Sequence, residues 1–130
     1  MIARGARAVK GPSRLAGVVL YVLSCVLGSW AMAVNRHFES TVFVAKDGSQ
    51  RVCSTGPYRV VRHPGYTAAA VGCIGYVWIL GSWWALVPAG LMIVLFVVRT
   101  SLEDATLKEE LPGYGEYAAR TTRRLMPLVW

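Results

Sequence analysis

The first long apolar stretch of the chain, residues 15–34, has 20 residues and no charged side chain. That is the length that one α-helix needs to cross about 30 Å of hydrocarbon. A cleavable signal peptide is the alternative, because four basic residues precede the stretch and Ala31-Met32-Ala33 has the small-x-small form of a cleavage site. The stretch is longer than a usual signal-peptide core of about 7–15 residues, which favours a retained helix.

The second apolar stretch, residues 64–98, has 35 residues without Asp, Glu, Lys or Arg. It is too long for one ordinary crossing and slightly short for two helices of about 20 residues. We expect a tight hairpin in which Gly81-Ser82 makes the turn and Trp83-Trp84 provides interfacial aromatic rings. The pattern therefore predicts an all-α integral membrane protein with about three transmembrane helices, at residues 15–34, 66–80 and 84–98.

The pattern changes to polar after Val98. Residues 99–111 are expected to continue the last helix into water until Pro112-Gly113, and residues 115–124 to form a further short helix. These would be amphipathic cytoplasmic helices. We expect a single domain over residues 1–130, made of a basic N-terminal segment (1–14), the membrane helices, a cytoplasmic connector (35–65) and a C-terminal cap (99–130).

Composition agrees with a membrane location. The chain is 55% hydrophobic and 16% charged, with a mean hydropathy of +0.43, whereas soluble domains have about 25% charged residues. A net charge of +7 is compatible with binding to nucleic acid or to anionic lipid, but no nucleic-acid-binding motif is present in the sequence. Residues 35–63 and 99–124 carry ten basic residues against four before residue 15, which favours a cytoplasmic connector and tail. The four basic residues near the N-terminus favour the same side and conflict with this orientation.

The three cysteines are widely separated, and two of them lie in the apolar stretches. This spacing indicates small buried side chains or free thiols rather than a disulfide framework, and no metal site is expected.

Polar residues gather in two blocks, residues 51–66 and 99–124, which the hairpin would return to one membrane face. In the first block, Tyr58, His63 and Tyr66 offer aromatic faces with polar tips, and two prolines restrict the backbone. An interfacial belt of aromatic and basic residues is the alternative interpretation, and we expect it to hold for Arg59 and Arg62.

In the second block, Arg99 and Glu103 are spaced i, i+4 and share one helix face at the membrane boundary. A charged residue against the membrane indicates a functional site. A simple ion pair between the two is the alternative; the Arg-before-Glu order is the less favourable one for helix pairing. Asp104, Glu109 and Glu110 are expected to form a solvated face.

The segment "GPYRVVRHPGY" (residues 56–66), the apolar hairpin, then Arg-x-x-x-Glu-Asp-x-x-Leu from residue 99 and the terminal "TTRRLMP" resemble the isoprenylcysteine carboxyl methyltransferase family. Upstream, "SWAMAVNRHF", with Asn35 and Phe38, is also similar to bacterial members of that family. The resemblance implies a membrane-embedded methyltransferase with S-adenosyl-L-methionine as cofactor. It also implies a cofactor pocket at the cytoplasmic face and a lipid-borne acceptor that enters from the bilayer.

The resemblance further implies roles for individual residues. His63, Pro64, Gly65 and Tyr66 match the His-Pro-x-Tyr that binds the cofactor, and Tyr58 matches an aromatic residue upstream of it. Glu103 matches an acidic residue that contacts the cofactor, and Arg99 matches the arginine that holds the acceptor carboxylate; both are the expected catalytic residues. The backbone that wraps the cofactor would be Gln50, Arg51, Val52 and Cys53, although "SQRVCSTG" departs from the commoner "HxLVTxG".

The expected activity is methyl transfer to the carboxylate of a prenylcysteine-like lipid, with membrane lipids as partners and a bacterial cell membrane as the location. Three alternatives stay open: phospholipid N-methylation, an NADPH-dependent membrane reductase, and a non-catalytic small membrane protein. Family members with more helices suggest that this short chain could complete its bundle as a homo-oligomer.

Overall fold

The computed structural model describes residues 11–38, 44–45, 47–127 and 130, and all regular structure within them is helical. The elements are α1 (Gly11–Val34), η1 (Gly56–Arg59), α2 (Pro64–Leu80), η2 (Trp83–Ala85), α3 (Leu86–Glu110) and α4 (Tyr114–Arg120). The predicted all-α membrane fold is confirmed. Most of the predicted basic N-terminal segment, residues 1–10, lies outside the described residues.

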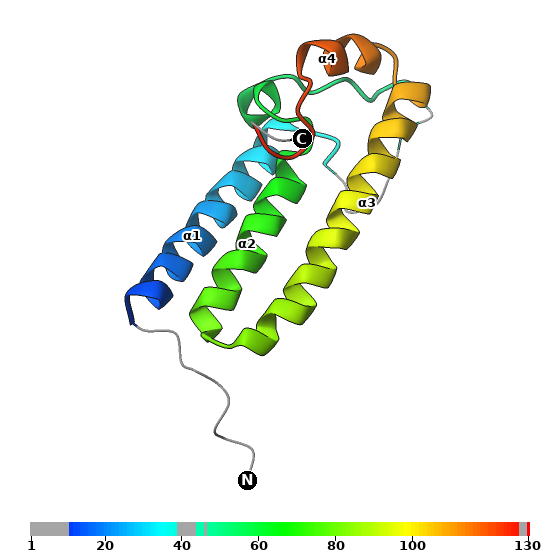
Figure 1. Cartoon of the computed structure of the whole chain (residues 1–130). Helices are drawn as coiled ribbons and strands as arrows, with labels where there is room; N and C mark the ends of the chain where they lie inside the picture. Colours follow the sequence, from blue (N-terminus) through cyan, green and yellow to red (C-terminus); the bar gives the residue numbers. More distant parts are fainter. Residues whose placement is uncertain (1–10, 39–43, 46, 128–129) are drawn as a thin grey trace.

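The three long helices lie side by side, with α2 between α1 and α3 (Figure 1). Glycines allow the backbones of α1 and α2 to touch: a Cβ at Gly17 would lie 2.7 Å from the Gly75 carbonyl oxygen, and one at Gly75 would lie 2.8 Å from that of Gly17. Small residues serve membrane helices in this way, because two apolar helices gain little hydrophobic free energy by leaving lipid and associate through close packing instead.

The hairpin turn falls where the sequence predicts it. Gly81 ends α2 in the left-handed conformation (φ 62°), which glycine adopts without a steric penalty, and its N–H donates to the Val77 carbonyl at 3.0 Å. Trp83 and Trp84 follow at the tip, 65% and 81% exposed, and are available for an interfacial position.

The helix lengths differ from the prediction in detail. Residues 13–34 and 83–110 form two segments of 22 and 28 residues, and each contains an 18-residue stretch with a mean hydropathy of 2.0, long and apolar enough to cross a membrane. The 17 residues of α2 extend only about 25 Å, less than a full hydrocarbon layer. The predicted crossing at residues 66–80 is therefore a shorter apolar helix that lies between two longer ones.

The polar end of α3 continues to Glu110, as predicted, but the last helix is shorter than expected. It ends at Arg120, because Thr121 has a non-helical conformation (φ −105°, ψ 84°). The chain then turns back toward the connector, where the carbonyls of Arg123 and Arg124 accept hydrogen bonds from the backbone N–H groups of Arg62 and His63, both at 2.9 Å.

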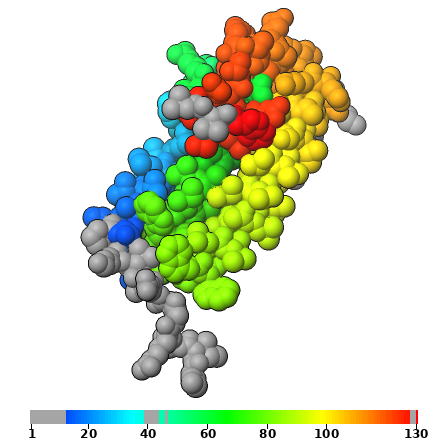
Figure 2. All heavy atoms as spheres, viewed as in Figure 1, coloured from blue at the N-terminus to red at the C-terminus, as the bar shows by residue number. Residues whose placement is uncertain are grey.

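Two regions of the molecule, here called the shaft and the head, differ in which side chains they expose and bury. The shaft, residues 13–30 and 68–98, exposes large apolar side chains such as Leu15, Val87 and Leu91 (61–66% exposed). The head, residues 31–38, 50–67 and 99–127, contains the buried hydrophobic cluster of Ala31, Tyr58, Leu111, Tyr114, Tyr117 and Ala118. In Figure 2 the orange and red C-terminal segment covers this end of the molecule.

Candidate active site

A cavity of about 320 Å³ lies in the head, where the connector, the start of α2, the polar end of α3 and α4 meet. A cavity of this size falls at the lower end of the range for small-molecule sites. Its wall is formed by Asn35, His37, Phe38, Gln50, Arg51, Val52, Cys53, Tyr58, Arg62, His63, Gly65, Tyr66, Ala69, Phe96, Arg99, Glu103, Leu107, Leu111, Tyr114 and Tyr117.

Nearly all residues that the sequence marks as a site line this one cavity. The segment Gln50 to Cys53 lies in its wall together with Tyr58, His63, Gly65, Tyr66, Arg99 and Glu103. Pro64 is the exception: it is fully buried at the first position of α2, where its missing N–H leaves no unpaired donor. Its position suits starting the helix rather than contacting a ligand.

Tyr66 contacts two charged residues of α3, Glu103 and Arg99. Its hydroxyl donates to Glu103 Oε2 at 2.6 Å, and the guanidinium carbon of Arg99 lies 5.8 Å from the centre of its ring. The cavity wall therefore contains a guanidinium and a carboxylate about one turn apart on α3, next to the aromatic ring of Tyr66 from α2.

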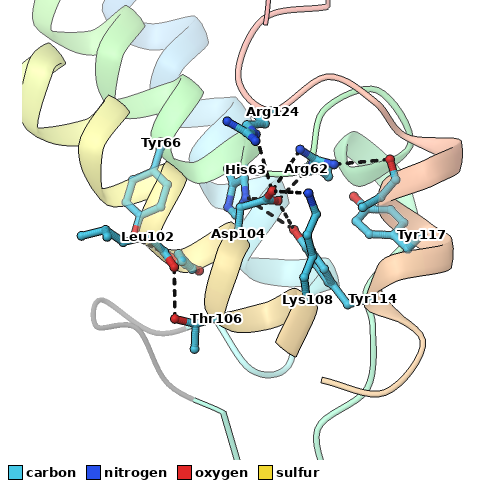
Figure 3. A network of polar contacts seen from close by, with 12 residues as sticks. Arg62, His63, Tyr66, Leu102, Asp104, Thr106, Lys108, Tyr114, Tyr117 and Arg124 are labelled. Atoms are coloured by element: carbon cyan, nitrogen blue, oxygen red, sulfur yellow. Dashed lines mark hydrogen bonds and ion pairs between the residues drawn. The ribbon is translucent and has the colours of Figure 1, made fainter. Parts of the chain in front are cut away.

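Asp104 is 1% exposed, so the expectation that it forms a solvated face is wrong. Figure 3 shows it at the centre of a polar network. Arg62 Nε lies 3.1 Å from its Oδ1 and Arg62 Nη2 3.1 Å from its Oδ2, while Lys108 and Arg124 lie 3.1 and 3.5 Å from Oδ2. The carboxylate is buried because several cations compensate it.

The expectation that Arg62 is an interfacial anchor is also wrong, since Arg62 is 6% exposed and faces Asp104. Its Nη1 also donates to the Ala118 carbonyl at 3.3 Å. Arg59, by contrast, is exposed, and Glu109 and Glu110 are exposed as predicted. Sequence spacing could not separate Arg62 from Arg59, because the partner of Arg62 lies 42 residues away.

Tyr114 and Tyr117 of α4 were not singled out from the sequence, although their i, i+3 spacing after Pro112-Gly113 puts them on one helix face. The Tyr117 hydroxyl donates to the Tyr58 carbonyl at 2.6 Å, and the Tyr114 hydroxyl donates to Asp104 Oδ1 at 3.0 Å. Burial raises the pKa of Tyr58 to about 12, and burial likewise raises the pKa of Tyr114 and Tyr117. All three therefore keep their protons at neutral pH.

An apolar groove adjoins the cavity on the shaft side. It runs between α1, α2 and α3, has a volume of about 670 Å³, and is lined almost entirely by apolar side chains. Phe38, Gly65, Ala69 and Phe96 line both spaces. The cavity and the groove thus share a wall formed by these four residues.

The sequence model of the phospholipid methyltransferase family matches residues 12–112, which is most of the chain. The chain belongs to this family. It is therefore a membrane methyltransferase that uses S-adenosylmethionine, and the predicted cofactor is confirmed. The matched residues include nearly all of α1, the whole of α2 and α3, the connector and every predicted site residue. No curated protein and no solved structure gives a significant match to the chain.

Membership of the phospholipid methyltransferase family tests the expected class of enzyme but not the expected acceptor. The predicted membrane methyltransferase is confirmed, and this class of enzyme is favoured over the reductase and non-catalytic alternatives. The match does not single out the prenylcysteine acceptor implied by the resemblance.

Proposed function

We propose that the cavity in the head binds S-adenosylmethionine and that the methyl group passes to the polar end of a lipid-borne acceptor. The observation that carries this proposal is that one cavity, adjoining an apolar groove, is lined by His63, Tyr66, Glu103 and Arg99. A cavity with charged side chains in its wall, beside an apolar groove, suits an acceptor with a reactive head and a hydrocarbon chain.

The residues in the wall fit the cofactor. S-adenosylmethionine combines a flat base, ribose hydroxyls, an amino acid group and a sulfonium that supplies an electrophilic methyl group. The rings of Tyr58, His63 and Tyr66 can pack on the base, and aromatic faces also suit a nearby cation. The Glu103 carboxylate can accept hydrogen bonds from the ammonium group or the ribose. Residues 50–53 lie in the same wall.

Arg99 is the proposed acceptor-binding residue. A guanidinium can hold a carboxylate by two parallel hydrogen bonds and so aim one of its oxygens. A carboxylate is already ionised at neutral pH and needs no general base, so the main tasks of the site are alignment and exclusion of water. Alignment of two reactants can contribute about 7–11 kcal/mol. We accordingly propose a prenylcysteine-like carboxylate as the first candidate acceptor.

An amine acceptor is the second candidate, because the matching family is that of phospholipid methyltransferases. A phosphatidylethanolamine amine is protonated at neutral pH and must lose a proton before it can accept a methyl group. Glu103 is the carboxylate in the cavity wall that could take this proton, and its hydrogen bond from Tyr66 would then compete with that role. The two candidates therefore differ in which α3 residue they require.

We also propose that the head faces the cytoplasm of a bacterial cell. The support for the cytoplasmic side is the count of basic residues: ten in residues 35–63 and 99–124, against four before residue 15. The bacterial cell is what the similarity of residues 29–38 to bacterial family members implies.

The test uses the full chain purified in detergent. Calorimetry with S-adenosylhomocysteine should detect binding, and Glu103→Ala or His63→Ala should weaken it about tenfold or more. Absence of binding to the folded wild-type chain would overturn the proposal.

Radiolabelled methyl transfer is then measured with prenylcysteine analogues and phosphatidylethanolamine. Arg99→Ala should preserve S-adenosylhomocysteine binding and abolish transfer to the carboxylate, whereas Arg59→Ala, an exposed arginine outside the cavity, should leave both unchanged. Transfer to the amine alone, with Arg99→Ala still active, would contradict the carboxylate and favour the second candidate.

A further inference from the structure

Asp104 is the most enclosed ionisable side chain of the head, at 1% exposure, and it is not among the residues that line the cavity. Its neighbour Glu103 does line the cavity. The two adjacent carboxylates of α3 thus point to different surroundings, and only Glu103 is placed to meet a ligand.

In the contact between Asp104 and His63, the histidine ring is the hydrogen-bond donor. His63 Nε2 lies 3.3 Å from Asp104 Oδ1, and both side chains are almost completely buried. The Tyr114 hydroxyl donates to the same Oδ1 at 3.0 Å, and its oxygen lies 3.4 Å from Nε2. An ionised carboxylate can only accept, so Nε2 must carry the hydrogen. The neutral ring is then left with Nδ1 as its acceptor.

The backbone around His63 is fixed from the other side. The N–H groups of Arg62 and His63 donate to the carbonyls of Arg123 and Arg124 at 2.9 Å, and the Arg62 guanidinium faces both oxygens of Asp104. Rotation of the His63 ring away from Asp104 would therefore leave a buried carboxylate with one fewer donor. Rotation would also take the buried Nε2–H of His63 away from its acceptor, and a buried donor that loses its partner is costly, so this ring orientation is favoured.

We propose that Asp104 is a positioning residue that holds His63 in the Nε2–H tautomer and in one ring orientation, and so determines what the ring presents to the cavity (Figure 3). Figure 3 shows Asp104 between His63, Arg62, Lys108 and Tyr114, which come from the connector, α3 and α4. The inference rests on the proposed function, because His63 is a proposed contact of S-adenosylmethionine. Orienting partners of this kind commonly change the affinity of the group they orient by about 10–100-fold at metal sites.

The tautomer can be measured directly on the wild-type chain. The protein has two histidines, so ¹⁵N-histidine NMR of the full chain gives two pairs of ring signals, one Nδ1 and one Nε2 for each histidine, and His37→Asn assigns the pairs. At a pH where the ring is neutral, His63 should show a protonated Nε2 and an unprotonated Nδ1. A protonated Nδ1, or signals averaged between both tautomers, would overturn the proposal.

A double-mutant cycle tests whether Asp104 acts through His63. Asp104→Asn should weaken S-adenosylhomocysteine binding about tenfold in the wild-type background and less than about twofold in a His63→Ala background, because coupled residues do not give additive effects. Equal losses in both backgrounds would show that Asp104 only supports folding, and would contradict the proposal. Glu109→Gln, which removes an exposed carboxylate from the same helix, is the matched control and should change affinity less than twofold.

The two measurements separate this inference from the proposed function. Loss of the fold in Asp104→Asn leaves the wild-type NMR measurement to decide. A wild-type chain that shows the Nε2–H tautomer but does not bind S-adenosylhomocysteine would contradict the proposed function, whereas binding with the opposite tautomer would overturn only the role of Asp104.

Discussion

The shaft buries mainly small side chains, whereas the head buries charged side chains and tyrosines. In the shaft, glycine and serine lie where α1 and α2 approach most closely, and leucine, valine and tryptophan point outward. In the head, Asp104, Arg62 and His63 are 1–6% exposed and lie among buried tyrosines. The outward apolar side chains of the shaft follow from the surrounding medium, because lipid offers no driving force to hide them, whereas water favours burial of the apolar cluster in the head.

The comparison also shows which region fixes the positions of its side chains most tightly. Close packing between the shaft helices depends on the shape of their surfaces and does not position charged or reactive side chains. The head uses charged side chains whose burial is tolerated only with well-placed partners, so each partner restricts the position of the others. A site that must align two ligands lies in the region where side chains are fixed most tightly.

The largest effect is expected from breaking the buried charge network of the head. Arg62→Met removes the cation that faces both oxygens of Asp104 and should lower the free energy of unfolding by about 3–5 kcal/mol. The midpoint of unfolding in mild detergent measures this. Arg59→Met, at an exposed position, should change the midpoint little. Similar midpoints for the two variants would mean that the buried pair contributes no more than a surface charge.

A smaller effect is expected from overpacking the shaft. Gly75→Ala puts a Cβ within 2.8 Å of the Gly17 carbonyl oxygen and should destabilise the chain by about 1–3 kcal/mol. Gly90→Ala is the matched control, because a Cβ at Gly90 meets nothing within 4 Å and alanine favours a helix. Unfolding midpoints should fall for the first variant and stay level or rise for the second; the reverse order would contradict the close contact of α1 and α2.

The smallest effect is expected from one neutral hydrogen bond of the head. Tyr117→Phe removes the donor to the Tyr58 carbonyl at 2.6 Å and should cost about 1 kcal/mol while leaving the ring packed. The unfolding midpoint and S-adenosylhomocysteine affinity are measured together. A loss of affinity much larger than the loss of stability would mean that Tyr117 contacts the ligand rather than supporting Tyr58.

Much of the architecture could be predicted because its causes are local. The uncharged lengths determine the number of helices, and Gly81 sits where a left-handed residue is needed. The polar blocks also indicated most of the cavity wall, since a hairpin must return residues 51–66 and 99–124 to one membrane face. The segment Gln50 to Cys53 was assigned through the family resemblance, and it lies in the cavity wall.

The sequence by itself thus determined the membrane class, the hairpin and the group of residues that meet in the head, because helix length and hydropathy depend on neighbours along the chain. Only the tertiary structure decided which charges are buried. Asp104 and Glu109 look alike in sequence, as do Arg62 and Arg59, yet one of each pair is enclosed and the other meets water. The reason is physical: a charge is stable in the interior only where opposite charges and donors from distant segments converge on it, and that convergence exists only once the chain has folded.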